Sequence, residues 1–195
     1  MASSELPIAV IGSGTVGTIL IAHLIESGME DVAVVDIPQR LEQIEKNGLQ
    51  VTKLRTITVK PSNLFSDISE LKDRGVRNLV VATKATEIAR VSPKIQEIDH
   101  PDMYVLSMHN GLGTEREMAS YIDPTRVGRM VVNFAGVRDE TTGEIAMSWF
   151  IPPNFIGPFQ EQDLGPYEEI AGLFTKVGLT TRAVQRGEIK RQAFF

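Results

Sequence analysis

A glycine-rich loop follows the first apolar run of this chain, and it restricts the possible fold more than any other feature. The run Ile8–Ile11 leads directly into Gly12-Ser13-Gly14-Thr15-Val16-Gly17. Three glycines at this spacing, after a strand and before a helix, are typical of the first turn of a dinucleotide-binding fold. In that pattern Gly12 makes the tight turn, Gly14 lets the backbone approach a pyrophosphate, and Gly17 lets the helix pack closely on the strand.

The segments after the loop have the order that this interpretation needs. Residues 16–27 have helical spacing, Gly28 ends the helix, and a second apolar run, Val32–Val35, ends at Asp36. The start of the helix would direct free N–H groups at the phosphates. A carboxylate 19 residues after Gly17 can accept hydrogen bonds from an adenosine ribose, although Asp36 also suits a helix-capping role before Pro38. We therefore expect residues 12–17 and Asp36 to bind a cofactor, with NAD(H) preferred over NADP(H).

Strands and helices alternate along the first two thirds of the chain. Strands are predicted at residues 8–11, 32–35, 49–51, 57–59, 78–83, 104–108 and 127–134, and helices at 16–27, 38–47, 85–98 and 114–121, with a kink or break at Pro93. This alternation predicts an α/β fold of Rossmann-like, doubly wound type, with a mainly parallel sheet and helices on both faces. Ligands bind beyond the carboxyl ends of such strands, where Asp36, Lys84 and Asn110 fall.

The pattern changes after residue 134. Residues 144–148 and 154–157 suggest a hairpin, 167–177 a helix and 180–184 a further strand, which together would extend the sheet at one edge. Residues 187–195 begin like a helix but allow only about two turns. We therefore expect a dinucleotide-binding domain over residues 1–186 and, at 187–195, the start of a truncated helical C-terminal domain.

Composition excludes several classes of protein. The 195 residues include no cysteine, so disulfides, thiolate metal sites and cysteine nucleophiles are absent. A net charge of −5 argues against a nucleic-acid surface, and no stretch approaches the roughly 18 apolar residues of a membrane span. The N-terminus lacks the segments of a signal peptide, which predicts a cytoplasmic protein without a membrane partner. His23, His100 and His109 lie far apart with no metal spacing, so no metal site is expected.

Further motifs follow the glycine loop in a fixed order. They are Val81-Ala82-Thr83-Lys84-Ala85, His109-Asn110-Gly111-Leu112-Gly113, Asn133-Phe134-Ala135-Gly136, Gly157-Pro158 and Glu188-Ile189-Lys190-Arg191-Gln192-Ala193-Phe194. With these motifs the whole chain resembles the ketopantoate reductase family, also called 2-dehydropantoate 2-reductases.

The resemblance implies hydride transfer from a reduced nicotinamide to the ketone of a 2-oxo acid substrate, giving a 2-hydroxy acid. It implies that Lys84 and Asn110 are catalytic and lie beside the nicotinamide ribose, and that the backbone of Gly136 contacts the cofactor. An ammonium or amide donor there would stabilise the negative charge that develops on the ketone oxygen. The residues alone leave alternatives open: Lys84 suits a solvated strand end, and Asn110-Gly111 suits a simple turn.

The chain departs from the family pattern at two places. Members that use NADP commonly carry a basic residue where this chain has Asp36, and Arg40, a turn further on, would compensate only in part. The acidic version resembles the NAD-dependent D-2-hydroxyacid dehydrogenases of the same superfamily. The family's proton-donating lysine aligns with the position after Phe195. We therefore expect the cofactor-binding half of an enzyme, which binds NADH but reduces 2-oxo acids little.

Three functions remain open from the sequence. The first is an oxidoreductase of the ketopantoate reductase type, and the second is an NAD-dependent D-2-hydroxyacid dehydrogenase acting on another 2-oxo acid. The third is a non-catalytic dinucleotide-binding module. Because family members often pair through the helical second domain, the resemblance also implies a homodimer for the full-length protein.

Overall fold

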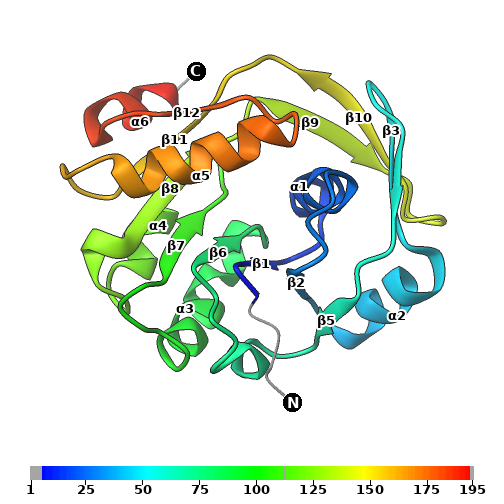
Figure 1. Cartoon of the computed structure of the whole chain (residues 1–195), viewed down its shortest axis with the longest axis horizontal. Helices are drawn as coiled ribbons and strands as arrows, with labels where there is room; N and C mark the ends of the chain where they lie inside the picture. The colour runs from blue at the N-terminus through cyan, green and yellow to red at the C-terminus, as the bar shows by residue number, and fades with distance from the viewer. Residues whose placement is uncertain (1–5, 112, 194–195) are drawn as a thin grey trace.

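The computed structural model describes residues 6–111 and 113–193, and an eight-stranded sheet forms its centre (Figure 1). The strand order is β12 (Thr181–Ala183), β11 (Asn154–Pro158), β8 (Val127–Val131), β7 (Tyr104–Ser107), β6 (Asn78–Val81), β1 (Ile8–Ile11), β2 (Val32–Val35) and β5 (Asn63–Phe65). The six strands from β8 to β5 are parallel, whereas β11 is antiparallel to β8. The predicted Rossmann-like, mainly parallel sheet is confirmed.

Helices cover both faces of this sheet, which explains why its strands are apolar at successive positions. α1 (Thr15–Glu26) and α5 (Gly165–Lys176) pack on one face, and α3 (Ile88–Gln96) and α4 (Thr114–Met118) pack on the other. In β1, Ile8 and Val10 enter the first core, whereas Ala9 and Ile11 enter the second. The two faces of one strand thus contribute to two separate cores.

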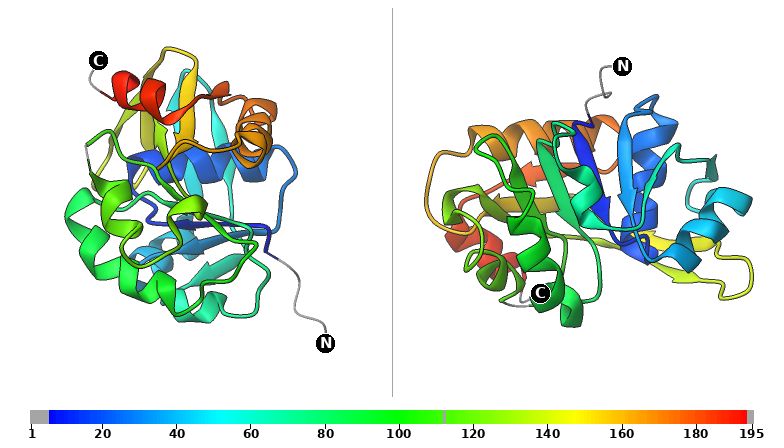
Figure 2. Two further views of the ribbon diagram at one scale, coloured as in Figure 1. Left: turned by 90° about the vertical axis from the view of Figure 1, so that its left-hand side faces the viewer. Right: turned by 90° about the horizontal axis from the view of Figure 1, so that it is seen from below.

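A second sheet, absent from the sequence-based expectation, covers the outer side of α1. Its strand order is β4 (Ile57–Val59), β3 (Leu49–Lys53), β10 (Ile145–Phe150) and β9 (Phe134–Arg138). Figure 1 shows β3, β9 and β10 curving over α1, and the left view of Figure 2 shows this helix between the two sheets. The eight consecutive residues from Gly17 to Leu24 are all buried, because α1 has a sheet on either side.

Two predictions for the segment after residue 127 are wrong. The strand expected at 127–134 is two strands, because the chain leaves the main sheet after β8 and enters the second sheet at β9. The side chain of Asn133 donates to the carbonyl of Pro153 (2.7 Å), which holds this crossing point. The hairpin expected at 144–157 does not form: β10 pairs with β9 and β3, whereas β11 pairs with β8 and β12. Only β11 and β12 extend the main sheet.

Two smaller differences concern β5 and α3. The three-residue strand β5 was not predicted, because it contains only two apolar residues, Leu64 and Phe65, which is too few to show a period. α3 runs through Pro93 as one helix, after a 3-10 turn at Ala85–Glu87, so of the kink or break expected there, the break does not occur. The missing N–H of Pro93 removes one backbone bond, and the Ser92 hydroxyl donates to the carbonyl of Ile88 nearby (2.8 Å).

The remaining helices are α2 (Pro38–Asn47), beside the glycine loop, and α6 (Arg186–Gln192), which packs through Ile189 on Val131 and Phe155 of the main sheet. The boundary at residue 186 therefore stays a prediction. Leu112 of the 109–113 motif, the first five residues and Phe194-Phe195 lie outside the described residues. In the described part of the chain, no helix is long and apolar enough to cross a membrane.

The buried imidazole of His23, on α1, predicts a pH dependence of stability. Burial lowers its pKa from the ordinary 6.5, and its Nδ1–H donates to the carbonyl of Ile19 (2.7 Å). Above pH 6.5 the imidazole is neutral in both states and stability is full; below it the unfolded chain takes up the proton first, so stability falls. We expect His23→Leu to make the loss of unfolding free energy between pH 7.5 and pH 5.5 smaller, by no more than about 1.4 kcal/mol, which is the limit for one group with an unfolded pKa of 6.5. Urea unfolding at the two pH values measures this, and equal losses in both proteins would contradict it.

Candidate functional site

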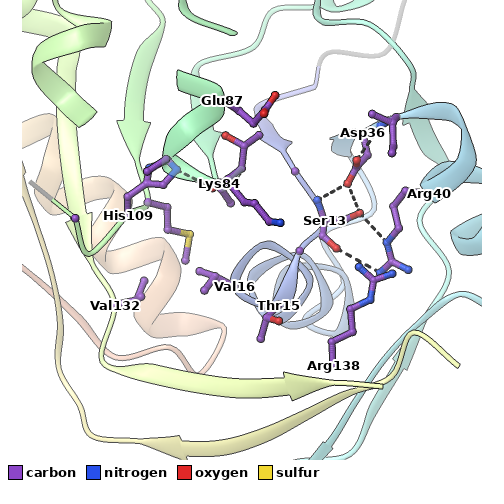
Figure 3. Close-up of a pocket in the computed structure, with 18 of the residues that line it drawn as sticks. Ser13, Thr15, Val16, Asp36, Arg40, Lys84, Glu87, His109, Val132 and Arg138 are labelled. Carbon is purple, nitrogen blue, oxygen red and sulfur yellow. Dashed lines mark hydrogen bonds between the residues drawn. The ribbon is translucent and has the colours of Figure 1, made fainter. Parts of the chain in front are cut away.

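A cleft of about 980 Å³ lies beyond the carboxyl ends of the parallel strands (Figure 3). Its walls come from the loops after β1, β2, β6 and β7, together with α2 and the end of β9. Of the residues predicted for the site, it brings together Gly12, Ser13, Gly14, Thr15, Val16, Asp36, Lys84 and Asn110. These residues are separated by up to 98 positions in sequence, and the parallel sheet places them in one cleft.

Two glycines of the loop have no room for a side chain. Gly12 has a φ of +95°, and a Cβ there would lie 2.9 Å from the backbone nitrogen of Thr83. A Cβ on Gly17 would lie 2.0 Å from the carbonyl oxygen of Gly12. By contrast, no atom beyond the two neighbouring residues in the chain lies within 4 Å of the Cβ position of Gly14, which lines the cleft. Packing within the protein therefore requires glycine at positions 12 and 17. Gly14 instead leaves space in the cleft that a side chain would occupy.

The N-terminus of α1 opens into this cleft and suits an anion. The first N–H groups of a helix have no partner inside the helix, and the N-cap residue, Gly14, has no side chain that could accept from them. No acidic residue lies in the first turn, where Thr15 and Val16 line the cleft. These N–H groups and the helix dipole favour negative charge at this point.

Asp36, at the end of β2, closes one end of the cleft. Its Oδ2 accepts hydrogen bonds from the backbone N–H of Ser13 (2.7 Å) and from the Ser13 hydroxyl (2.5 Å), and its Oδ1 accepts from the N–H of Ile37 (2.8 Å). A carboxylate has about four acceptor positions. One position on Oδ1 therefore remains for a ligand hydroxyl, and a second becomes available if the Ser13 hydroxyl turns away.

Two arginines stand at the same end, and only Arg40 was considered from the sequence. Arg40 is buried, and its Nε donates to the Ser13 hydroxyl (3.2 Å). Burial and the nearby Arg138 lower the pKa of Arg40, whereas Asp36 raises it. Figure 3 shows the two guanidinium groups approaching from α2 and from β9. Arg138 was missed because it lies in the second sheet, which no part of the glycine pattern indicates.

Lys84 stands on the other side of the glycine loop, after β6. Its exposed side chain extends into the cleft toward the start of α1 (Figure 3). Glu87 and Arg90 line the same wall, and the Arg90 Nε donates to Glu87 (2.7 Å). Glu87 is already paired with Arg90, whereas the ammonium of Lys84 is directed into the cleft on the side of the loop after β6.

His109, after β7, is held in a defined hydrogen-bonding state. Its Nε2 lies 2.8 Å from the carbonyl of Thr83, so this nitrogen carries the proton and donates. Its Nδ1 then accepts from the Ser107 hydroxyl (2.9 Å), which in turn lies 2.6 Å from the hydroxyl of Thr114. Burial lowers the pKa of His109. The imidazole is therefore neutral, and it ties the loop after β7 to the loop after β6.

Asn110 is exposed at the same end of the cleft, and its carboxamide contacts the backbone just after β8. Its Nδ2 donates to the carbonyl of Val132 (3.2 Å), and its Oδ1 accepts from the Val132 N–H (3.1 Å). One amide hydrogen and one oxygen lone pair remain for a ligand. Gly136, also predicted for the site, lies in β9 outside the lining of the cleft, where a Cβ would be 3.3 Å from the side chain of Thr15. Its contact with a cofactor stays a prediction.

Residues 8–152 match the sequence model of the family described as Ketopantoate reductase PanE/ApbA. Solved structures agree in fold. The 2-dehydropantoate 2-reductase from Geobacter metallireducens GS-15 has a TM-score of 0.81 at 26% identity, covering 96% of this chain and 60% of that one. The enzyme from Porphyromonas gingivalis W83 has a TM-score of 0.74 at 21% identity, covering 93% and 64%.

A D-mandelate dehydrogenase, solved as a ternary structure with NADH and anilino(oxo)acetate, is also similar. It has a TM-score of 0.77 at 20% identity, covering 96% of this chain and 59% of that one. The present chain thus spans about 60% of the length of these structures.

Proposed function

The chain belongs to the ketopantoate reductase family, and from this membership we propose that it binds a nicotinamide dinucleotide for the reduction of a 2-oxo acid to a 2-hydroxy acid. The observation that carries the proposal is the cleft, with an anion-binding loop at its centre and polar groups of different chemistry at its two ends. We propose residues 1–186 as the dinucleotide-binding domain.

The residues of the cleft fit such a cofactor along its length. The pyrophosphate, which is the middle of the molecule, suits the N–H groups at the start of α1 and the open space over Gly14. The adenosine ribose suits Asp36, and the nicotinamide half then extends to the opposite end, toward Lys84 and Asn110. The glycine loop lies between the two polar ends of the cleft, just as the pyrophosphate lies between the two nucleosides of a dinucleotide.

The choice between the two nicotinamide cofactors rests on Asp36. A free acceptor position on its carboxylate suits a ribose hydroxyl, whereas its negative charge repels a 2′-phosphate. Arg40 already donates two hydrogen bonds to Ser13, so fewer of its N–H groups remain to bind a phosphate. We therefore propose NAD(H) as the preferred cofactor.

The opposite end of the cleft supports the proposed reaction. When bound, a reduced nicotinamide supplies a hydride to the carbonyl carbon of the substrate. Lys84 and Asn110 each have donor hydrogens available there, and such donors stabilise an oxygen on which negative charge develops. His109 remains neutral and hydrogen-bonded on both nitrogens, so its part is to hold the two loops together.

A second candidate within the same chemistry is an NAD-dependent D-2-hydroxyacid dehydrogenase acting on a different 2-oxo acid. Asp36 favours it, because a carboxylate at the ribose position suits NADH, the cofactor named in the D-mandelate dehydrogenase structures. Rates of NADH oxidation with ketopantoate and with phenylglyoxylate separate the two candidates. Binding of NADH without oxidation by either acid is the result expected of a binding module.

Lys84→Met tests the assignment of the two ends of the cleft. If Lys84 contacts the nicotinamide half, its loss weakens NADH binding about tenfold and leaves the binding of ADP-ribose, which lacks the nicotinamide, within about twofold. Calorimetric titration of the variant with both ligands measures this. Lys72→Met is the matched control, because Lys72 is an exposed lysine away from the cleft. Equal weakening of both ligands would contradict the assignment.

A further inference from the structure

Arg129, on β8, is the largest fully buried side chain of the described residues, and it lies directly behind the loop that carries Asn110. A guanidinium cannot lose its proton in a protein, so its burial is costly unless acceptors surround it. Replacing a buried ion pair by apolar residues of similar size is often neutral or stabilising. The stability of the core alone therefore gives little reason for an arginine at this position.

The acceptors of Arg129 indicate what its charge does instead. Its Nη2 donates to the carbonyl of His109 (3.0 Å) and to the carbonyl of Gly111, and its Nη1 donates to Glu115 of α4 (3.2 Å). The two carbonyls belong to the residues immediately before and after Asn110. The guanidinium thus holds the backbone on both sides of Asn110, whose side chain lines the cleft.

Other contacts also attach the loop of Asn110 to β8 and the residue that follows it. The carboxamide of Asn110 pairs with the backbone of Val132, just after β8, and Ser107 of β7 lies opposite Arg129 in the sheet. The end of β8 therefore serves as the support on which residues 109–111 are placed. Without the guanidinium, the buried carbonyl of His109 would lose this donor and the carbonyl of Gly111 would lose its anchor, so the loop would be free to move.

We propose that Arg129 is a positioning residue for the nicotinamide end of the cleft, fixing the backbone on both sides of Asn110. The inference rests on the proposed dinucleotide site, and it concerns one half of that site only. The adenosine end is built from the loops after β1 and β2, which Arg129 does not contact. A change at Arg129 should therefore affect one half of the cofactor and spare the other.

The test compares NADH with ADP-ribose by calorimetric titration of Arg129→Met. We expect NADH to bind about tenfold more weakly, with ADP-ribose affinity within about twofold of the unsubstituted protein. Arg126→Met is the matched control: Arg126 pairs with Asp99 (2.5 and 2.7 Å) and donates to the carbonyls of His100 and Met103, at the amino ends of β7 and β8 and away from the cleft. This variant should lose thermal stability and keep its affinity for both ligands.

Other outcomes separate this inference from the proposed function. Unchanged NADH affinity in a folded Arg129→Met protein, or equal weakening of both ligands, would overturn the positioning role and leave the dinucleotide site intact. If Arg129→Met does not fold, Arg129→Lys takes its place, because it keeps the charge opposite Glu115 but cannot hold both carbonyls. It should weaken NADH selectively by about threefold, and equal effects on the two ligands would overturn the role. If the unsubstituted protein bound neither NADH nor ADP-ribose, the proposed function and the inference would both be overturned.

Discussion

Asp36→Asn is expected to reduce the preference of this protein for NADH over NADPH by about 10- to 100-fold. Like charges about 4 Å apart near a protein surface repel by at most about 4 kcal/mol at an effective dielectric constant of about 20, and salt screening at this partly exposed position lowers the repulsion to the roughly 1.4–2.8 kcal/mol that a 10- to 100-fold change represents. The change removes this repulsion toward a 2′-phosphate and leaves Arg40 and Arg138 beside the position. The asparagine oxygen still accepts from the Ser13 N–H, which keeps the glycine loop tied to β2, whereas the exposed Ile37 N–H loses its side-chain acceptor and turns to water. Titration with each reduced cofactor measures the ratio of the two dissociation constants.

The control for this prediction is Asp31→Asn. Asp31 is exposed just before β2, whereas Asp36 follows its other end, so the two substitutions change the net charge equally. Only the change at Asp36 should alter the ratio. In the Asp36→Asn background, adding Arg138→Gln should remove most of the gain in NADPH affinity, since the guanidinium would be the partner of the phosphate. An unchanged ratio in Asp36→Asn would show that Asp36 does not select the cofactor.

The parallel half of the fold could be predicted because its signals are local. The run before Gly12 and the run before Asp36 are buried on both faces, so they are apolar throughout and end at turn residues. The order of such strands in a doubly wound sheet follows from the handedness of their connections. The loops after these strands consequently share one edge, and the cleft could be located there from sequence.

The second sheet could not be predicted, because its pairing depends on contacts between distant segments. β3 pairs with β10 in register from Val51 with Ile145, almost a hundred residues later. The runs themselves look like ordinary short strands, and nothing local distinguishes a hairpin at 144–157 from the observed arrangement. α1 contained an indirect signal: a helix that is apolar almost all round must be covered on more than one side.

The same limit applies to the site. Gly12, Gly14, Asp36 and Lys84 are adjacent to strand ends and could be assigned from spacing. Arg138 comes from the second sheet, and its place beside Asp36 became visible only in the structure.

Gly17→Ala is expected to destabilise the protein by roughly 3 kcal/mol and to abolish dinucleotide binding. The new Cβ would lie 2.0 Å from the carbonyl oxygen of Gly12, and backbone on both sides leaves no flexible atom to move. α1 or the glycine loop would have to shift, which displaces the N–H groups that face the cleft. Thermal unfolding together with NADH titration measures both effects. At this chain length, 3 kcal/mol corresponds to a fall in melting temperature of about 6–12 °C.

The same substitution at Gly172 should have the opposite sign, which separates local crowding from the general effect of glycine in a helix. Gly172 lies inside α5, and no atom beyond its chain neighbours and the nearby backbone of its own helix lies within 4 Å of its Cβ position. Alanine there removes conformational freedom from the unfolded chain and stabilises the helix by about 0.5–1 kcal/mol. If both variants were stabilised, the close approach of α1 to Gly12 would be wrong. If both were destabilised, α5 would carry a constraint other than packing, and the Gly17 result would no longer measure crowding at the glycine loop.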